Sequence, residues 1–359
     1  MPLTVLSIAF PFAPVGPGAV GGSEQVLSDI DAALVSAGHR SVVVACEGSE
    51  TRGELYPVPL SINERLDDEA RRRCREQFQA TIDRVLRSND IDVIHMHGMD
   101  FDQYSLSPNI PVVVTLHMPI DWYERNMWDR FPGRVQFVCV SESQRQTCPQ
   151  SLREDVTVVL NGVELPAFDD AGPKQDYAIA LGRICPEKNF HEALEAGTLA
   201  KTRVLLGGQV FPYEEHQRYF NEKIQPLLAV DGKDVKHEFL GPIGAARRQQ
   251  LLAQARCLLH PTLAPETSSL VAMEALAAGT PVIAYRSGAL TEIVEDGVTG
   301  LLVNGVEEMA EAIRRVDAIS PAACRSAAER RFSVRNMVRG YFDLYEQMKR
   351  QNSPEPAYA

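Results

Sequence analysis

Two glutamates in the second half of the chain are placed where they could contact a polar ligand. Glu266 lies in a loop, and Glu274 follows eight residues later within an apolar, helix-like stretch. The hydroxyl residues Thr267–Ser269 are typical N-cap residues and predict that a helix begins near Leu270. A helix N-terminus presents free N–H groups and a partial positive charge, which suit a phosphate. Carboxylates beside it accept hydrogen bonds from sugar hydroxyls, so this stretch indicates a nucleotide-sugar site.

Two cations follow another strand-like run. Arg183 and Lys188 come after Tyr177–Leu181 and are five residues apart across a proline turn. This spacing places a forked guanidinium and a compact ammonium where a diphosphate could lie. A departing nucleoside diphosphate gains negative charge, which such cations stabilise without a metal.

The sequence around both pairs resembles a known enzyme family. The Glu-x7-Glu spacing, followed by EALAAGTPVIA and GALTEIVEDGVTGLLV, is similar to the donor-binding signature of the retaining glycosyltransferases of family 4. The segment LGRICPEKN resembles that family's G-R-x-x-x-x-K motif. The resemblance implies that Glu266 contacts the donor sugar and Glu274 the nucleotide ribose. The family usually has Phe-Gly where this chain has Ser268-Ser269, which alters the space beside the donor.

The resemblance extends, more weakly, to the first half of the chain. Gly21-Gly22-Ser23 is similar to a family turn that lets donor phosphates approach the backbone before the first helix. His117 ends a strand-like run, and family relatives have a catalytic histidine there, beside the donor sugar. The alternative for His117 is a residue that closes the strand, with Asp121 as its partner.

The resemblance thus implies two sets of residues. The catalytic set is His117, Arg183, Lys188 and Glu266. The donor-binding set is Gly21, Gly22, Ser23, Arg183, Lys188, Glu266, Ser268, Ser269, Leu270 and Glu274.

No metal ligands are predicted. Asp-x-Asp pairs occur at positions 29/31, 90/92 and 100/102, but chance pairs are expected among 48 acidic residues. His95 and His97 share one face of a strand without an evident third ligand, so we interpret them as structural or as part of the acceptor site.

The elements that must position these residues alternate between strand-like and helical patterns, which is typical of α/β proteins with parallel sheets. The resemblance implies a GT-B architecture, in which two Rossmann-like α/β/α domains face a central cleft. We expect an acceptor-binding domain over residues 1–165 and a donor-binding domain over 176–333. The helix at about 334–350 is expected to cross back to the first domain, although a cap on the second domain explains its apolar stripe equally well. Residues 351–359 are predicted to be a disordered tail.

The composition of the chain argues against some classes of binding partner. The 359-residue chain has a net charge of −12, which argues against nucleic acid as a partner. Up to Glu164 the chain contains no Lys, and its acidic residues outnumber its arginines, so membrane association is not indicated and a soluble acceptor is favoured. Seven scattered cysteines without CxxC spacing are typical of buried, reduced thiols. We predict a cytoplasmic protein, because no signal peptide or long apolar span is evident.

The sequence therefore predicts a retaining, hexosyltransferase-type glycosyltransferase. It would move a sugar from a nucleotide-sugar donor, preferably UDP-linked, to an unknown hydroxyl acceptor, with no cofactor required. Alternatives are a non-catalytic nucleotide-sugar-binding protein and an epimerase or phosphorylase of the same architecture. The least favoured alternative is a dehydrogenase that binds its dinucleotide at the G-x-G-x-x-G run of residues 16–21. Such a site needs its first glycine directly at the end of a strand, and here several residues separate the run from the preceding strand. A G-x-S-x-G elbow and a P-loop are both absent from the sequence, which disfavours a serine hydrolase and an NTPase.

Overall fold

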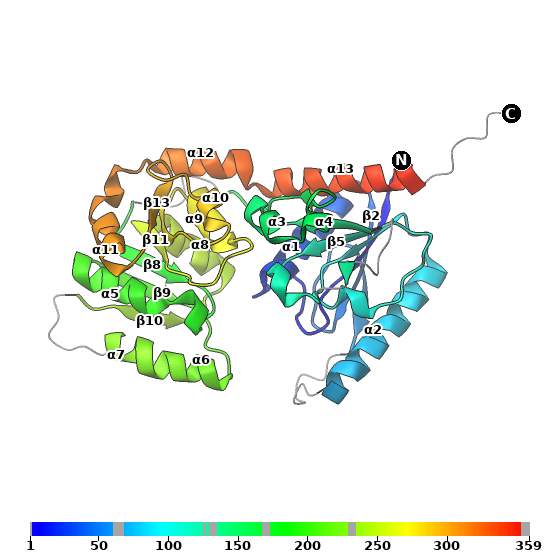
Figure 1. Ribbon diagram of the computed structural model, residues 1–359, viewed down its shortest axis with the longest axis horizontal. Coiled ribbons are helices and arrows are strands. Elements are labelled where there is room, and N and C mark those ends of the chain that lie inside the picture. The colour runs from blue at the N-terminus through cyan, green and yellow to red at the C-terminus, as the bar shows by residue number, and fades with distance from the viewer. Residues whose placement is uncertain are drawn as a thin grey trace. The chain divides into compact units, whose positions relative to one another are not determined.

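The computed structural model describes residues 2–59, 68–124, 127–128, 135–166, 173–228 and 235–352. The chain divides into two compact units, which we describe separately. Unit 1 comprises Met1–Leu160 and Met337–Ala359, and unit 2 comprises Asn161–Asn336. Each unit contains a parallel sheet with helices packed on it, as Figure 1 shows. The α/β, Rossmann-like fold class predicted from the sequence is confirmed.

Unit 1 is built on a seven-stranded parallel sheet in the order β3-β2-β1-β4-β5-β6-β7. Its strands are β1 (Thr4–Ile8), β2 (Arg40–Cys46), β3 (Glu54–Val58), β4 (Val93–Met96), β5 (Val112–Leu116), β6 (Val135–Cys139) and β7 (Thr157–Val158). Strand β3 is not evident from the sequence, because it is only partly buried and contains Pro57. A proline is tolerated there because β3 lies at the edge of the sheet.

The helices of unit 1 include three that helical patterns in the sequence predict, over about 22–37, 63–87 and 334–350. The helices are α1 (Gly22–Ser36), α2 (Asp68–Ser88), α3 (Glu142–Thr147), α4 (Gln150–Arg153) and the C-terminal α13 (Val334–Asn352), with short 3₁₀ turns η1 (Phe101–Gln103) and η2 (Ile120–Trp122). Helix α2 buries Cys74, Phe78, Ile82 and Val85 at helical spacing against the sheet. The part of its predicted range before Asp68 lies outside the described residues.

Helix α13 completes the core of unit 1 although it follows unit 2 in the chain. Tyr341 and Tyr345 are both fully buried. The Tyr345 hydroxyl lies 2.6 Å from Nδ1 of His95, and the Tyr341 hydroxyl lies 3.0 Å from Oγ1 of Thr115. The crossing of the last helix to the first domain is therefore confirmed, and the alternative of a cap on the second domain is wrong.

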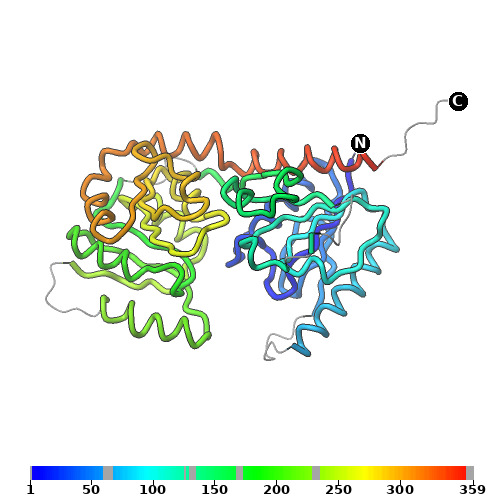
Figure 2. Tube along the Cα trace, viewed as in Figure 1, coloured from blue at the N-terminus to red at the C-terminus, as the bar shows by residue number. Residues whose placement is uncertain are grey.

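The two ends of the described chain meet in unit 1. Asp92 accepts a hydrogen bond from the backbone N–H of Thr4 and pairs with Lys349, each at 2.8 Å. The start of the first strand and the end of the last helix consequently lie near one another, as Figure 2 shows. The disordered tail was predicted to begin at residue 351, but residues 351 and 352 belong to α13, and the rest of the predicted tail lies outside the described residues.

Unit 2 is built on a six-stranded parallel sheet in the order β10-β9-β8-β11-β12-β13. Its strands are β8 (Tyr177–Leu181), β9 (Arg203–Gly207), β10 (Glu238–Gly241), β11 (Cys257–His260), β12 (Val282–Tyr285) and β13 (Gly300–Val303). Its helices are α5 (Phe190–Ala200), α6 (Glu214–Tyr219), α7 (Gln225–Leu228), α8 (Ala245–Gln254), α9 (Leu270–Ala277), α10 (Leu290–Ile293), α11 (Val306–Arg315) and α12 (Pro321–Arg331). Shorter turns are η5 (Pro186–Lys188), η6 (Phe220–Ile224) and η7 (Val316–Ala318).

The strand order of unit 2 reverses between β8 and β11. From β8 the chain proceeds outward to β9 and β10, then returns to β11 on the other side of β8. Ligands of open α/β sheets bind at the carboxyl ends of the strands that flank such a reversal. The loops that leave β8 and β11 are those that carry the predicted Arg183, Lys188 and Glu266. Across the described residues, no helix is long and apolar enough to span a membrane.

Candidate active site

Lys188 and Glu266 form the centre of the candidate site in unit 2. Nζ of Lys188 lies 2.5 Å from Oε1 of Glu266, and the two side chains are 24% and 14% exposed. Burial raises the pKa of the Glu266 carboxyl, but the charge of Lys188, the nearby His260 and hydrogen bonds from Lys188 and Thr262 together hold that pKa below its usual value. The predicted cation and the predicted carboxylate, 78 residues apart in sequence, therefore meet as a charged pair.

The backbone joins the two loops that carry this pair. The N–H of Leu263 and the hydroxyl of Thr262 both donate to the carbonyl of Glu187, at 2.9 and 3.1 Å. The turn η5 is followed by Asn189, whose φ of 56° is in the left-handed region that asparagine tolerates. Lys188 is thus held by a tight turn that is tied to the loop after β11.

Gly288 supports Glu266 from the other side. Its φ is +50°, and a Cβ at this position would lie 2.3 Å from the carbonyl oxygen of Glu266 and 2.6 Å from its nitrogen. The next residue, Ala289, donates its N–H to the same carbonyl at 2.8 Å. Gly288, the first residue of the segment GALTEIVEDG, is therefore required by the close approach of two backbones.

Helix α9 begins beside this pair, as predicted. Ser269 is its N-cap and accepts a hydrogen bond from the N–H of Ala272, and Leu270 is its first residue. The Ser269 hydroxyl lies 2.9 Å from Nε2 of His260, a ring whose pKa is lowered by burial to about 4. The Ser268 hydroxyl oxygen is buried and has no hydrogen-bond partner among the described residues. An uncharged histidine and an unpaired hydroxyl therefore accompany the free N–H groups of α9.

Glu274 lies in the second turn of α9 and is held by an arginine that the sequence did not reveal. Nη2 of Arg248, on α8, donates to its Oε1 at 2.8 Å. Burial raises the pKa of Glu274, and the Arg248 guanidinium offsets part of this effect. Nothing in the local pattern of α8 distinguishes Arg248 from the neighbouring Arg247, so the partner could be found only in three dimensions.

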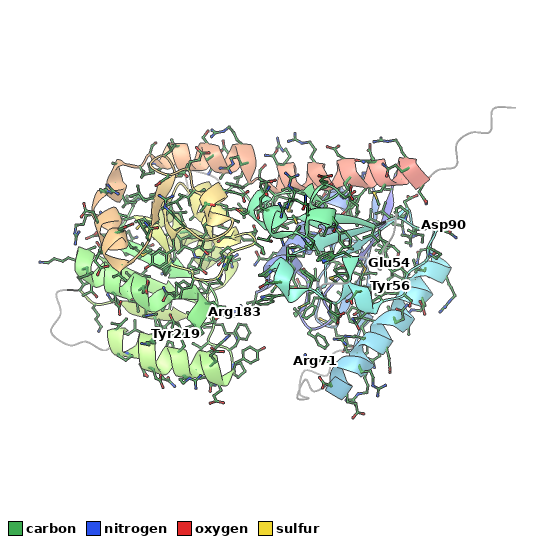
Figure 3. The ribbon with its side chains drawn as sticks, in the orientation of Figure 1. Glu54, Tyr56, Arg71, Asp90, Arg183 and Tyr219 are labelled. Carbon is green, nitrogen blue, oxygen red and sulfur yellow. The ribbon has the colours of Figure 1, made fainter. Side chains whose placement is uncertain are left out.

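Arg183 lies on the loop directly after β8 and is exposed. Figure 3 labels it at the end of unit 2 that also contains Tyr219 of α6. Gly182, before it, packs closely against the loop after β9, because a Cβ on Gly208 would lie 1.7 Å from the Gly182 carbonyl oxygen. Arg183 thus projects from a firmly packed turn.

The predicted glycine turn of unit 1 forms the start of α1. Gly21 is the N-cap, and Gly22 and Ser23 open the helix. A Cβ on Gly21 would lie 1.8 Å from Oε2 of Glu24, whose carboxylate folds back over the helix start and accepts from the Ser23 hydroxyl at 2.9 Å. Burial raises the pKa of Glu24. A phosphate at this helix start would therefore meet a carboxylate, which the sequence reasoning did not anticipate.

His117 of unit 1 lies in a group of three histidines. Its Nε2 is 3.2 Å from Nδ1 of His97, and the two rings are stacked with centroids 5.5 Å apart. Both nitrogens of the third ring, His95, are engaged by Tyr345 and Thr115. Burial lowers the pKa of His117 to about 4, so the ring is neutral at pH 7. His95 is structural, whereas His97 orients the predicted catalytic histidine.

The sequence allows two interpretations of the aromatic residues in the loops at about 100–108 and 119–132: they stack on an acceptor sugar, or they close a loop over the core. Tyr104 and Tyr123 are buried in the core of unit 1. Trp122 is 54% exposed. Closure over the core therefore holds for the two tyrosines, whereas the exposed Trp122 is available to stack on a ligand.

The three Asp-x-Asp pairs each contain an aspartate that the protein itself engages. Asp31 accepts from the backbone N–H groups of Arg52 and Gly53, Asp92 pairs with Lys349, and Asp100 accepts from the Tyr104 hydroxyl. These contacts give the aspartates structural roles.

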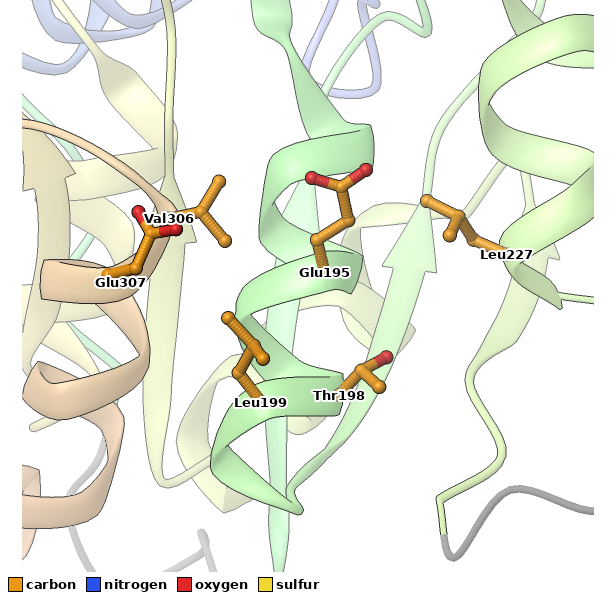
Figure 4. A pocket seen from close by; sticks show the side chains of 6 residues that line it. All are labelled: Glu195, Thr198, Leu199, Leu227, Val306 and Glu307. Atoms are coloured by element: carbon orange, nitrogen blue, oxygen red, sulfur yellow. The ribbon is translucent and has the colours of Figure 1, made fainter.

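A shallow cavity of about 320 Å³ lies elsewhere on unit 2. It is lined by Glu195, Thr198 and Leu199 of α5, Leu227 of α7, and Val306 and Glu307 of α11, as Figure 4 shows. None of the predicted site residues lines it, so we do not associate it with the charged pair.

Family models match both halves of the chain. Residues 20–166 match the model described as Glycosyltransferase Family 4, and residues 175–317 match the model described as Glycosyl transferases group 1. The two models together span most of the chain. The chain belongs to glycosyltransferase family 4.

Sequence relatives of this glycosyltransferase act on different acceptors. The chain is 27% identical over 272 residues to a phosphatidyl-myo-inositol mannosyltransferase of Mycobacterium tuberculosis, with 70% of this chain and 68% of the relative covered. It is 53% identical over 270 residues to a D-inositol 3-phosphate glycosyltransferase of Kribbella flavida, with 63% and 62% covered. The enzyme class predicted from the sequence, a glycosyltransferase, is confirmed.

Solved structures share the fold of this glycosyltransferase over almost its whole length. A glycosyltransferase of avilamycin A biosynthesis, AviGT4, matches with a TM-score of 0.73 at 24% identity, covering 97% of this chain and 98% of that one. Anabaena Alr3699/HepE, solved in complex with UDP, matches with a TM-score of 0.72 at 20% identity, covering 96% and 100%. At these identities the likeness concerns the fold.

Proposed function

We propose that this glycosyltransferase moves a sugar from a UDP-linked donor to a hydroxyl acceptor, with retention of anomeric configuration. The observation that carries the proposal is the Lys188–Glu266 pair, formed beside the start of α9 at the reversal of strand order. A fixed cation and a fixed carboxylate next to free helix N–H groups suit a ligand that has both phosphates and sugar hydroxyls.

The charges support a division of roles among the side chains of this site. Lys188, with the exposed Arg183, would stabilise the diphosphate as it leaves, because negative charge develops on its terminal phosphate. Glu266, ionised at neutral pH, would accept hydrogen bonds from the donor sugar. Glu274, held by Arg248, would accept from the ribose, with only one carboxylate oxygen already engaged by that arginine.

In this proposal His117 acts through its neutral ring. A histidine with a pKa of about 4 carries no charge at pH 7, so it would donate or accept a hydrogen bond at a sugar hydroxyl and would not supply a positive charge. The contact with His97 would fix the orientation of its ring. The donor phosphate would then assist deprotonation of the acceptor hydroxyl.

The choice of UDP is supported by Anabaena Alr3699/HepE, which was also solved with UDP-glucose. A soluble acceptor is favoured by the lack of lysine in the part of the chain up to Glu164. Transfer without a metal, and a cytoplasmic location, complete the proposal.

A thermal-shift panel with UDP, GDP, ADP and NAD tests the donor class. We expect UDP alone to raise the melting temperature of the wild-type protein. Lys188→Ala should lose that rise, whereas Lys223→Ala, a change at an exposed lysine of the same unit, should keep it. A rise with NAD alone, or an equal UDP response in Lys188→Ala, would contradict the proposal.

Retention is tested separately, once a donor sugar is found. The anomeric configuration of the first product formed, read by proton NMR, should match that of the donor. An inverted product would refute the retaining mechanism even if UDP binds.

A further inference from the structure

Three potential metal ligands lie together where α6 meets the loop that carries Lys188, and the proposed transfer reaction does not use them. Cys185, Glu187 and His216 each place one ligand atom within 4.8 Å of the other two. Cys185 and Glu187 flank the proline that starts η5, and His216 lies on α6, which packs against that turn. The cluster therefore combines a thiol, a carboxylate and an imidazole from two elements of unit 2.

His216 is held in place but incompletely satisfied. Its side chain is 8% exposed, and its Nδ1 is buried with no hydrogen-bond partner among the described residues. The ring packs edge-on against Tyr213 and Phe211, with centroids 5.1 and 6.5 Å away. A buried imidazole nitrogen without a partner costs free energy, which a metal bond would recover.

Cys185 and Glu187 supply the other two ligand types. The Cys185 side chain is fully buried, and its thiol donates a hydrogen bond to the Arg183 carbonyl oxygen at 3.4 Å, which a metal–thiolate bond would replace. Glu187 is exposed and gives an ion a path from solvent to the buried sulfur. The carboxylate and the thiol are also close enough to interact with each other.

We propose that Cys185, Glu187 and His216 bind a Zn²⁺ ion, with a fourth position open to water. Sulfur, nitrogen and oxygen together match the ligand preferences of zinc, whereas Mg²⁺ and Ca²⁺ prefer oxygen alone. Zinc bonds of about 2.0–2.3 Å place ligand atoms about 3.5 Å apart, so no pair in the cluster needs to approach by more than about 1.3 Å. Side-chain rotation of the exposed Glu187 achieves part of this.

Binding of this ion would fix the η5 turn in one conformation. Lys188 is the next residue after Glu187, so the ion would bind beside the candidate active site without using its charged pair. This inference does not rest on the proposed function, because it concerns different side chains and is tested with metal alone.

Cobalt absorption provides a direct test, because a bound thiolate gives Co²⁺ a charge-transfer band in the near ultraviolet. Full-length protein is stripped with a chelator under reducing conditions and titrated with Co²⁺, then with Zn²⁺ in competition. We expect one equivalent of Co²⁺ to produce the band and one equivalent of Zn²⁺ to displace it. Lack of the band in the wild-type protein would overturn the proposal.

Matched variants identify the ligands. Cys185→Ser should abolish the band, and His216→Gln and Glu187→Gln should weaken Zn²⁺ affinity at least about tenfold. Cys324→Ser, which removes another buried thiol of unit 2, should leave the band unchanged. A band that survives in Cys185→Ser would overturn the assignment. Glu187 is exposed, so its variant tests the site even if a buried change impairs folding.

Discussion

Replacing Lys188 by alanine tests the central pair most directly. The change leaves the Glu266 carboxylate, only 14% exposed, without its cation. Breaking a fully buried pair costs about 3–5 kcal/mol, and the residual exposure of both side chains reduces this to about 2 kcal/mol. For a unit of this size, we expect the melting temperature to fall by about 5 °C. The fold should therefore survive.

The effect on transfer should be larger than the effect on stability. Loss of one group that stabilises developing charge typically lowers the rate about 100- to 1,000-fold, which corresponds to about 3–4 kcal/mol. Release of nucleoside diphosphate in a coupled assay measures this loss at saturating donor. Lys223→Ala is the control and should retain wild-type turnover.

A double variant separates the two effects. In Lys188→Ala/Glu266→Gln no buried charge is left unpaired, so the free energy of unfolding should recover most of what the single variant loses, while transfer stays low. The deficit of the single variant should also narrow as pH falls below the usual glutamate value of 4.5. The variant's buried carboxyl, without its cation, is neutralised first, and the wild-type protein loses its ion pair only at the lower pKa of its own Glu266. Wild-type turnover in Lys188→Ala, or a double variant no more stable than the single one, would refute this account.

Three further predictions follow from the same unit. His260 has a pKa of about 4 in the folded protein against a usual 6.5. The free energy of unfolding should therefore fall by on the order of 3 kcal/mol as pH drops from 6.5 toward 4. Thermal melts of His260→Gln should show a weaker dependence on pH. Gly288→Ala should lower the free energy of unfolding of unit 2, measured in urea titrations, by clearly more than Gly297→Ala. Both glycines have positive φ, but nothing lies within 4 Å of a Cβ at Gly297. Equal losses would contradict the close-approach argument. Arg248→Ala should raise the KM for the donor about tenfold by freeing Glu274, with kcat changed less; an unchanged KM would exclude this role.

Local patterns were sufficient for much of the fold. The N-cap at Ser269 and the limits of α1 and α13 agree with the sequence prediction, because caps and helical spacing act over a few residues. Strand β3 was missed because an exposed edge strand lacks the alternating pattern of a buried one. Helix α13 could be predicted as a helix, and the family resemblance implied that it crosses to the first domain, but only its buried contacts excluded a cap on the second domain.

The sequence indicated individual residues of the candidate site, but it did not indicate the contacts between them. The family signature indicated Lys188 and Glu266, yet their pairing depends on how the loops after β8 and β11 meet. Arg248 and His97 carry no local signal, since an arginine on an amphipathic helix and a histidine on a strand are ordinary. Their functions depend on partners 20 or more residues away in sequence.

The position of α13 also sets an order for biogenesis. A ribosome completes all of unit 2 before it synthesises Tyr341 and Tyr345, the side chains that engage Thr115 and His95 in the core of unit 1. Nascent unit 1 must therefore persist with part of its core uncovered while about 180 further residues emerge, a state that favours chaperone binding. A circularly permuted chain that begins near residue 161 and joins the two original ends would make unit 1 contiguous and remove this delay.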